Sequence, residues 1–322
     1  MRVWRESRKF SWAIADQVVV SGGNFVSGIL LARLLGIEDF GVYVLAWAIV
    51  LFVQSIQFST ISTPMLSIGP KHDTKNVDLF FGGIFLQQIV FGLASALLTW
   101  LGTPFAAALF PHAKLEFIAP ALATAVLSCQ AQDFLRRYFF TTTRPAISFA
   151  IDILRYFVQI ALLVLYASIN SSFNSAMALW IASGAAAFAS VAILPCVSPM
   201  KWSVEEALKQ ARSHWHFSKW LTASVLLNWA IGNLSFLFAG TLIGTAAVGG
   251  IRAAQYLAGV AHLVIEAAGN VVPPRASSEF VTGGRPKLRA YLQHVTLYGS
   301  ISIVAVTAIF AFKPEFWLLL VW

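Results

Sequence analysis

The sequence predicts an all-α integral membrane protein, a polytopic helix bundle with one six-span lobe and a partial second lobe related to it by a parallel repeat. Three observations predict this class: a composition too poor in charge for a soluble protein, nine apolar stretches of membrane-spanning length, and a motif that returns after six of these stretches. Strands are not expected, because the stretches are long and rich in Ala and Leu and lack the alternation of barrel strands.

Composition is the first of these observations. Of the 322 residues, 58% are hydrophobic and 11% are charged, and the mean hydropathy is +0.74. Soluble domains carry about 25% charged residues, so this chain must place much of its surface in lipid. The net charge of +8 is the balance of 22 Lys and Arg against 14 Asp and Glu. Basic cytoplasmic loops of membrane proteins account for such an excess, and no nucleic-acid partner is needed to explain it.

The apolar stretches are the second observation, since a helix needs about 20 mostly apolar residues to cross a bilayer. The expected spans are 12–34, 40–67, 79–102, 117–135, 147–169, 175–198, 219–243, 246–272 and 291–313. The two cysteines, Cys129 and Cys196, lie in these stretches without a C-x-x-C pair or a histidine cluster beside them. We therefore expect no disulfide framework, no metal and no cofactor.

Loop charge predicts the orientation of the bundle. With the N-terminus in the cytoplasm, 18 of the 22 basic residues fall on the inner side. Cytoplasmic loops are the ones enriched in Lys and Arg, so we expect a cytoplasmic N-terminus. The first stretch resembles a signal peptide because Arg8 and Lys9 precede it. It is too long for an h-region and contains Asp16 and Asn24, so we interpret it as a retained span.

The connection after the sixth span has internal order. Ser203 and Glu206 form an S-x-x-E capping box, and Val204, Leu208 and Trp215 follow at helical spacing. This pattern predicts an amphipathic helix in the cytoplasmic interface, either as a plain connector or as a hinge. The expected parts are a six-helix lobe at 1–198, the linker helix at 199–218 and a partial lobe of three spans at 219–322.

The internal repeat is the third observation. Gly36 and Gly41 stand where the first span passes into the second, and Gly244 and Gly249 stand where the seventh passes into the eighth. The second pair follows the first at an offset of 208 positions (244 less 36, and 249 less 41). The same offset within one residue relates Phe10-Ser11 to Phe217-Ser218 and Pro64 to Pro273. Six spans is an even number, so both copies start on the same side, as in parallel-repeat transporters. Two six-span lobes need twelve spans, so we expect either a fragment or a second lobe built differently.

These residues carry a family resemblance. Three segments resemble bacterial polysaccharide transporters: the opening Asn24-Phe25 with 30–41, the connection 132–145, and the stretch 243–255. These transporters are the O-antigen flippase branch of the multidrug, oligosaccharidyl-lipid and polysaccharide exporter superfamily. The resemblance implies a multi-pass protein of the bacterial inner membrane. It would flip an undecaprenyl-pyrophosphate-linked oligosaccharide, the repeat unit of O-antigen or exopolysaccharide, by alternating access. Partners implied are this lipid-linked oligosaccharide, membrane lipids, a polysaccharide polymerase and glycosyltransferases.

Polar side chains within the spans are the candidate site residues, because an ionisable group at mid-helix costs about 2.5–3.5 kcal/mol in lipid. Asp16 would bind a coupling proton or cation, or would pair with Arg8 or a neighbouring helix. Gln54 and Gln57 would line a wet cavity and bond sugar hydroxyls, or would join helices by hydrogen bonds. Arg155, three residues after Asp152 on one helix face, would hold pyrophosphate or form an intrahelical pair.

The eighth span carries the longest polar stripe. Its members share one helix face or adjoin it, and they are Arg252, Gln255, His262, Glu266 and Asn270. Arg252 is a candidate for phosphate binding and Gln255 for sugar binding, with Asn228 of the seventh span facing them. Glu266 is a candidate for the coupling proton or ion. The alternative for the whole stripe is polar contact between helices.

Two other functions compete with the flippase. A cation-coupled multidrug exporter would share the architecture, and Asp16 and Glu266 would serve its coupling. A membrane polymerase or ligase is the third, but it would need a large outside loop rich in Arg and His. The chain has neither that loop nor a Gly-x-Ser-x-Gly elbow, an H-E-x-x-H motif or a nucleotide-binding glycine loop, so we do not expect an enzyme.

Overall fold

The computed structural model describes residues 2–69, 77–109, 115–169 and 173–312. The described residues form helices and no strand, which confirms the all-α prediction. Five of the described helical stretches are long and apolar enough to cross a membrane. The chain divides into two compact units, Met1–Gly249 and Gly250–Trp322.

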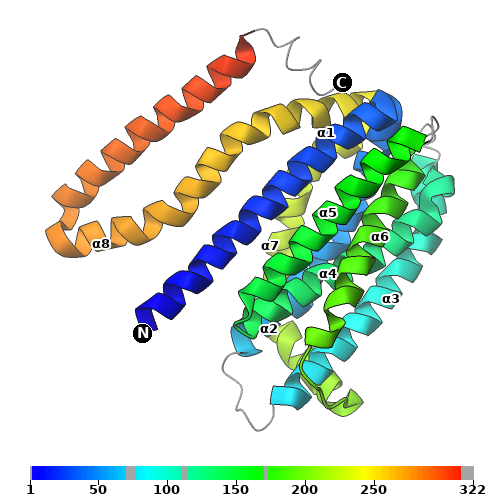
Figure 1. Cartoon of the computed structure of the whole chain (residues 1–322), viewed down its shortest axis with the longest axis horizontal. Coiled ribbons are helices and arrows are strands. Elements are labelled where there is room, and N and C mark those ends of the chain that lie inside the picture. Colours follow the sequence, from blue (N-terminus) through cyan, green and yellow to red (C-terminus); the bar gives the residue numbers. More distant parts are fainter. Residues whose placement is uncertain (1, 70–76, 110–114, 170–172, 313–322) are drawn as a thin grey trace. The chain divides into compact units, whose positions relative to one another are not determined.

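The first unit contains a bundle of long helices (Figure 1). Its elements are α1 (Arg2–Gln57), a π-helical turn (Phe58–Ser62), α2 (Thr63–Ile68), α3 (Val77–Leu109), α4 (Ala119–Thr141), α5 (Pro145–Ile169), α6 (Ser175–Ile193) and α7 (Val204–Leu242). Short 3₁₀ turns at Leu115–Ile118 and Leu194–Cys196 precede α4 and follow α6. The expected first, second, third, fifth, sixth and seventh spans all fall on these helices.

Two local features interrupt the first pair of spans. Gly36 lies inside α1 with φ 68° and ψ 172°, a conformation that glycine adopts without steric cost, and it separates the two expected spans. The π-helical turn comes just before Pro64. Proline lacks an N–H and clashes with the carbonyl four residues earlier, so the wider turn relieves this clash. Thr63 Oγ1 donates to the carbonyl of Phe58 at 2.9 Å and supports the turn.

Helix α4 lies at the centre of the first unit, in contact with α3, α5 and α6. Most of its residues are buried. Aromatic rings of α3 and α4 pack edge to face beside it, with Phe81 and Phe85 at 5.1 and 5.3 Å from Tyr138. The predicted fourth span therefore exists as a helix, but it is not among the five described stretches apolar enough to face lipid. Its position explains this, because its neighbours are other helices.

Helix α7 differs from the expected arrangement. The capping serine is confirmed, since Ser203 Oγ accepts the backbone N–H of Glu206 at 3.2 Å. Glu206 does not complete the box; its carboxylate accepts from Gln210 Nε2 at 3.0 Å. The helix then continues without a break to Leu242. The predicted surface helix and the seventh span are thus one helix, and no helix end separates 218 from 219.

Helix α8 runs from Thr245 to Ala311, and most of it lies in the second unit. The chain reverses near Gly284, whose φ is +62° (Figure 1). Lys287 Nζ reaches Glu279 Oε2 at 3.5 Å beside this turn. The expected eighth and ninth spans lie on α8 before and after the turn, and neither is among the five described stretches apolar enough to cross a membrane.

Candidate functional site

Charged side chains from three helices meet inside the first unit. Arg136 of α4 donates through Nη2 to the carboxylate of Asp16 on α1. Its Nε lies 2.7 Å from Oδ2 of Asp152 on α5. Both carboxylates are 1% exposed. One guanidinium thus joins α1, α4 and α5, because a buried carboxylate without a cation would be strongly unfavourable.

A glutamine extends this network to the second arginine. Gln132 Nε2 donates to Asp152 Oδ1 at 2.6 Å, and Gln132 Oε1 accepts from Arg155 Nη1 at 2.7 Å. Arg155 also contacts Cys129 Sγ at 3.9 Å and is 8% exposed. Asp152 therefore pairs with Arg136 of the neighbouring helix, whereas Arg155 is held through Gln132. The two arginines balance the two aspartates in charge.

Tyr156 fastens α1 to the same region. Its hydroxyl donates to Asn24 Oδ1 at 3.0 Å, and the Arg155 guanidinium lies 5.3 Å from its ring centroid. The ring packs against Gly23 so closely that a Cβ there would overlap ring carbons. Any side chain larger than hydrogen at 23 would displace the ring.

Amide side chains form a second buried cluster between α1, α3 and α4. Gln57 is fully buried and donates to Gln88 Oε1 at 2.9 Å and to the Gln130 carbonyl at 3.1 Å. Gln130 Nε2 donates to Ser95 Oγ at 2.9 Å, and Gln54 Nε2 to the Cys129 carbonyl at 3.3 Å. Gln54 and Gln57 thus make the interhelical hydrogen bonds that were the alternative to a wet cavity. The cluster adjoins the charged network through Cys129 and its helix.

Two members of the charged network, Arg136 and Gln132, were not predicted from the sequence. Both fall within the family-like connection 132–145, and Arg136 also counts among the inner-side charges, but neither was predicted as a site residue. The available signal was their spacing on one helix, since 129, 132 and 136 share a face. The relatively polar composition of α4 was a second signal, because a helix of low hydropathy among apolar spans belongs in the interior of a bundle.

The two copies of the repeat meet in a reciprocal backbone contact. Gly36 and Gly244 both have positive φ, 68° and 119°. A Cβ on Gly41 would overlap the carbonyl oxygen of Thr245, and a Cβ on Gly249 would overlap the carbonyl oxygen of Ile37. Ile37 directly follows Gly36, and Thr245 directly follows Gly244. Gly41 therefore packs on the carbonyl of the residue after Gly244, and Gly249 packs on the carbonyl of the residue after Gly36.

The remaining candidates lie apart from the buried network. Arg252 is half-buried, donates through Nη1 to Gln255 Oε1 at 3.1 Å, and lies 5.1 Å from the Tyr256 ring. Gln255 is exposed, as is Asn228 on α7. The side chain of Glu266, like those of His262 and Asn270, lies outside the described residues.

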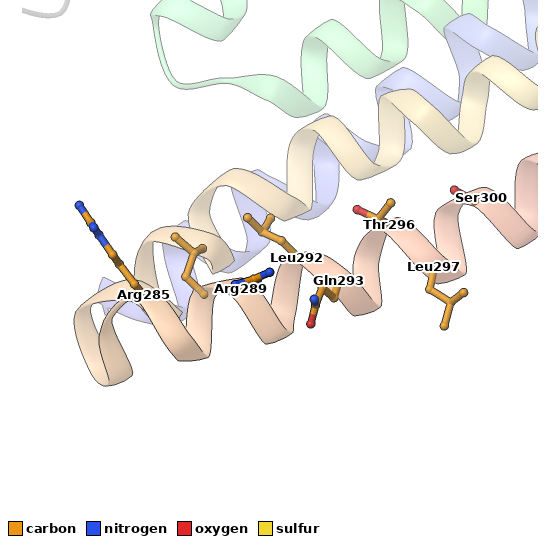
Figure 2. A pocket seen from close by; sticks show the side chains of 8 residues that line it. Arg285, Arg289, Leu292, Gln293, Thr296, Leu297 and Ser300 are labelled. Atoms are coloured by element: carbon orange, nitrogen blue, oxygen red, sulfur yellow. The ribbon is translucent and has the colours of Figure 1, made fainter.

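A groove runs along the second arm of α8. Figure 2 shows Arg285 and Arg289 at its turn end, followed by Leu292, Thr296 and Ser300 along the arm. None of the predicted site residues lines it. Among the described residues, no cluster of three or more His, Cys, Asp or Glu is arranged to hold a metal ion.

Comparison with known proteins identifies one relationship. A family model described as "Polysaccharide biosynthesis protein" matches residues 30–318. No curated protein and no solved structure matches the chain. The match includes both glycine pairs, at 36 and 41 and at 244 and 249, and extends over parts of both units.

Proposed function

The chain belongs to the polysaccharide biosynthesis protein family, and from this membership we propose that it flips a lipid-linked oligosaccharide across the bacterial cytoplasmic membrane. A role in polysaccharide biosynthesis or export follows from the family and the membrane-spanning helices. The proposed substrate is an undecaprenyl-pyrophosphate-linked repeat unit of O-antigen or exopolysaccharide. The proposed mechanism is alternating access, in which the substrate site opens to each side in turn.

The observation that carries this proposal is the reciprocal contact of Gly41 with Thr245 and Gly249 with Ile37. Alternating access in repeat transporters needs two similar halves that move as bodies around a substrate site. The contact supports such halves, because it relates two copies of one motif by a two-fold exchange. It also places backbone directly against backbone at both glycines.

The charged network supports the same proposal from within the first half. Asp16, Arg136, Asp152 and Arg155 are bonded to one another or to Gln132 across three helices. Such a network holds these helices in one arrangement, so the half can move as a body. We propose that Arg155 positions the network and that Asp16 is the group through which a proton or cation would loosen it.

Substrate contacts are proposed for the side chains outside the network. Arg252 would bind pyrophosphate oxygens, and Gln255 and Asn228 would bond sugar hydroxyls, since guanidinium forms charge-assisted bonds to phosphate. Gln54 and Gln57 would join them only if their interhelical bonds open during transport. Glu266 would take up the coupling proton or ion. A polysaccharide polymerase and glycosyltransferases are the proposed partner proteins.

The test is restoration of surface polysaccharide in a bacterium that lacks its own flippase for one known repeat unit. The full-length protein should restore polysaccharide, and an Arg252→Ala variant of equal abundance in the membrane should not. Restoration of drug resistance without polysaccharide would instead indicate a multidrug exporter. Failure with every lipid-linked repeat unit offered, at normal membrane abundance, would contradict the proposed function.

A further inference from the structure

The first half of α7, residues 204–220, has three different faces. The face that packs into the bundle is buried, and its members are Ala207, Gln210, His214 and Ser218. An adjoining face is apolar and exposed, and its members are Val204, Leu208 and Trp215. At 3.6 residues per turn these three side chains lie one above another. Trp215 is 57% exposed, so no described part of the chain covers this stripe.

The third face is basic. Lys209, Arg212 and Lys219 are exposed and lie next to the apolar stripe on the side away from the bundle. Lys201 is exposed just ahead of the helix. Glu205 is the one exposed acidic residue among the described side chains of 201–220. The surface beside the apolar stripe is therefore positively charged overall.

Contacts with α3 show which part of that helix this half of α7 lies beside. Gln87 Nε2 donates to the Ala207 carbonyl at 3.0 Å, ten residues beyond the start of α3 at Val77. His214 packs on Phe80, only three residues beyond that start, with 6.3 Å between ring centroids. The first turns of α7 thus run beside the end of a membrane-capable helix instead of extending away from it. The next segment, Ser218–Leu242, is itself apolar enough to span.

We propose that this face of α7 binds the headgroups of anionic phospholipids. The apolar stripe enters the boundary between headgroups and acyl chains, where amphipathic helices bury one face and where Trp side chains concentrate. Lys209, Arg212 and Lys219 then meet the lipid phosphates from the adjoining face, and their aliphatic stems lie along the apolar surface. Each basic residue near an anionic surface contributes attraction that salt weakens. Anionic lipid bound there would therefore stabilise the position of the start of α7 beside α3.

The test compares lipid selectivity in the full-length protein reconstituted into phosphatidylcholine bilayers. Spin-labelled phosphatidylglycerol and spin-labelled phosphatidylcholine are added separately, and electron paramagnetic resonance gives the fraction of each probe immobilised at the protein surface. The variant is K209Q/R212Q/K219Q. The matched control is R285Q/K287Q/R289Q, which removes three exposed charges from α8 within five residues. All six side chains are exposed, so both variants retain the packed bundle.

The wild-type protein is expected to prefer the phosphatidylglycerol probe over the phosphatidylcholine probe. In the α7 variant this selectivity is expected to be lower by about fivefold or more at low salt. The control is expected to keep most of it. High salt should lower the preference of the wild type and leave the α7 variant unchanged. An absence of preference in the wild type, or an equal loss in the two variants, would overturn the proposal. Neither result depends on transport, so the proposed function is tested separately.

Discussion

Gly41 of α1 and Gly249 of α8 make two matching close contacts with backbone carbonyls. Gly41 packs on the carbonyl of Thr245, the residue after Gly244. Gly249 packs on the carbonyl of Ile37, the residue after Gly36. A parallel repeat read from sequence spacing predicts similar helices in the two halves. The structure adds that the copies touch each other at the repeated motif itself.

Substituting either glycine should separate the copies. Gly41→Ala and Gly249→Ala each place a methyl group on a carbonyl oxygen that belongs to a helix and cannot move away cheaply. We expect each to destabilise the protein by about 1–3 kcal/mol, the usual cost of overpacking. Thermal unfolding in detergent measures this. Gly184→Ala on α6 is the control, because open space surrounds it and alanine favours a helix. Equal melting temperatures for all three variants would contradict the contact.

Two adjacent arginines of α4 should differ strongly in their effect on stability. Arg136→Gln leaves Asp16 and Asp152 buried without their cation, and breaking a buried pair costs about 3–5 kcal/mol. Arg137→Gln removes a partly exposed pair with Asp133 and a contact with the Phe58 ring, for which we expect about 1 kcal/mol. Folded yield and melting temperature measure both. The triple variant D16N/R136Q/D152N should recover part of the loss, because it removes the unpaired charges together.

Substitution of Gln57 distinguishes two interpretations of the amide cluster, interhelical hydrogen bonding and a wet cavity that binds substrate. Gln57→Leu deprives Gln88 Oε1 and the Gln130 carbonyl of their donor. We expect a loss of about 1–3 kcal/mol in stability, since both acceptors are buried. Gln54→Leu should cost less, because its single bond is longer and partly exposed. Melting temperature and transport are measured together. Lost transport at unchanged stability would mean that Gln57 contacts substrate, as in the wet-cavity interpretation.

Arg252 is expected to act on transport and not on folding. Arg252→Ala removes a half-buried guanidinium that bonds Gln255 within its own helix. Helix propensity is nearly unchanged by this substitution, so membrane abundance should equal that of the wild type. Surface polysaccharide should be lost, and Glu266→Gln should have the same effect. Arg289→Ala is the control on the other arm of α8. Normal polysaccharide with both Arg252→Ala and Glu266→Gln would remove the polar stripe from the substrate site.

The sequence predicted the helices because these depend on local composition and spacing. The break between the first two spans was expected between 34 and 40, where the apolar runs are interrupted, and the structure places it at Gly36. Ser203 was identified as a cap from its S-x-x-E spacing to Glu206. The continuity of α7 was not predicted, because a change from amphipathic to apolar pattern does not by itself end a helix.

Contacts between residues that are distant in sequence could not be predicted from the sequence. Asp16 and Arg136 are 120 positions apart, and nothing near either residue specifies the other. The spacing of Asp152 and Arg155 instead suggested a local pair, yet Arg136 is nearer to Asp152 and Gln132 binds Arg155. Which of two arginines a buried carboxylate selects depends on how three helices pack, and single-sequence periodicity does not contain that.

The proposed movement of a lipid-linked oligosaccharide between leaflets is measured most directly in proteoliposomes. They contain the full-length protein and a fluorescent undecaprenyl-pyrophosphate-linked oligosaccharide in both leaflets. A membrane-impermeant reagent that modifies the sugar is added outside. Without transport only the outer-leaflet pool reacts. We predict that the wild-type protein renders the inner pool reactive as well, and that Arg252→Ala vesicles behave like empty ones. An inner pool that stays protected with wild-type protein, across a range of imposed proton and sodium gradients, would contradict the account.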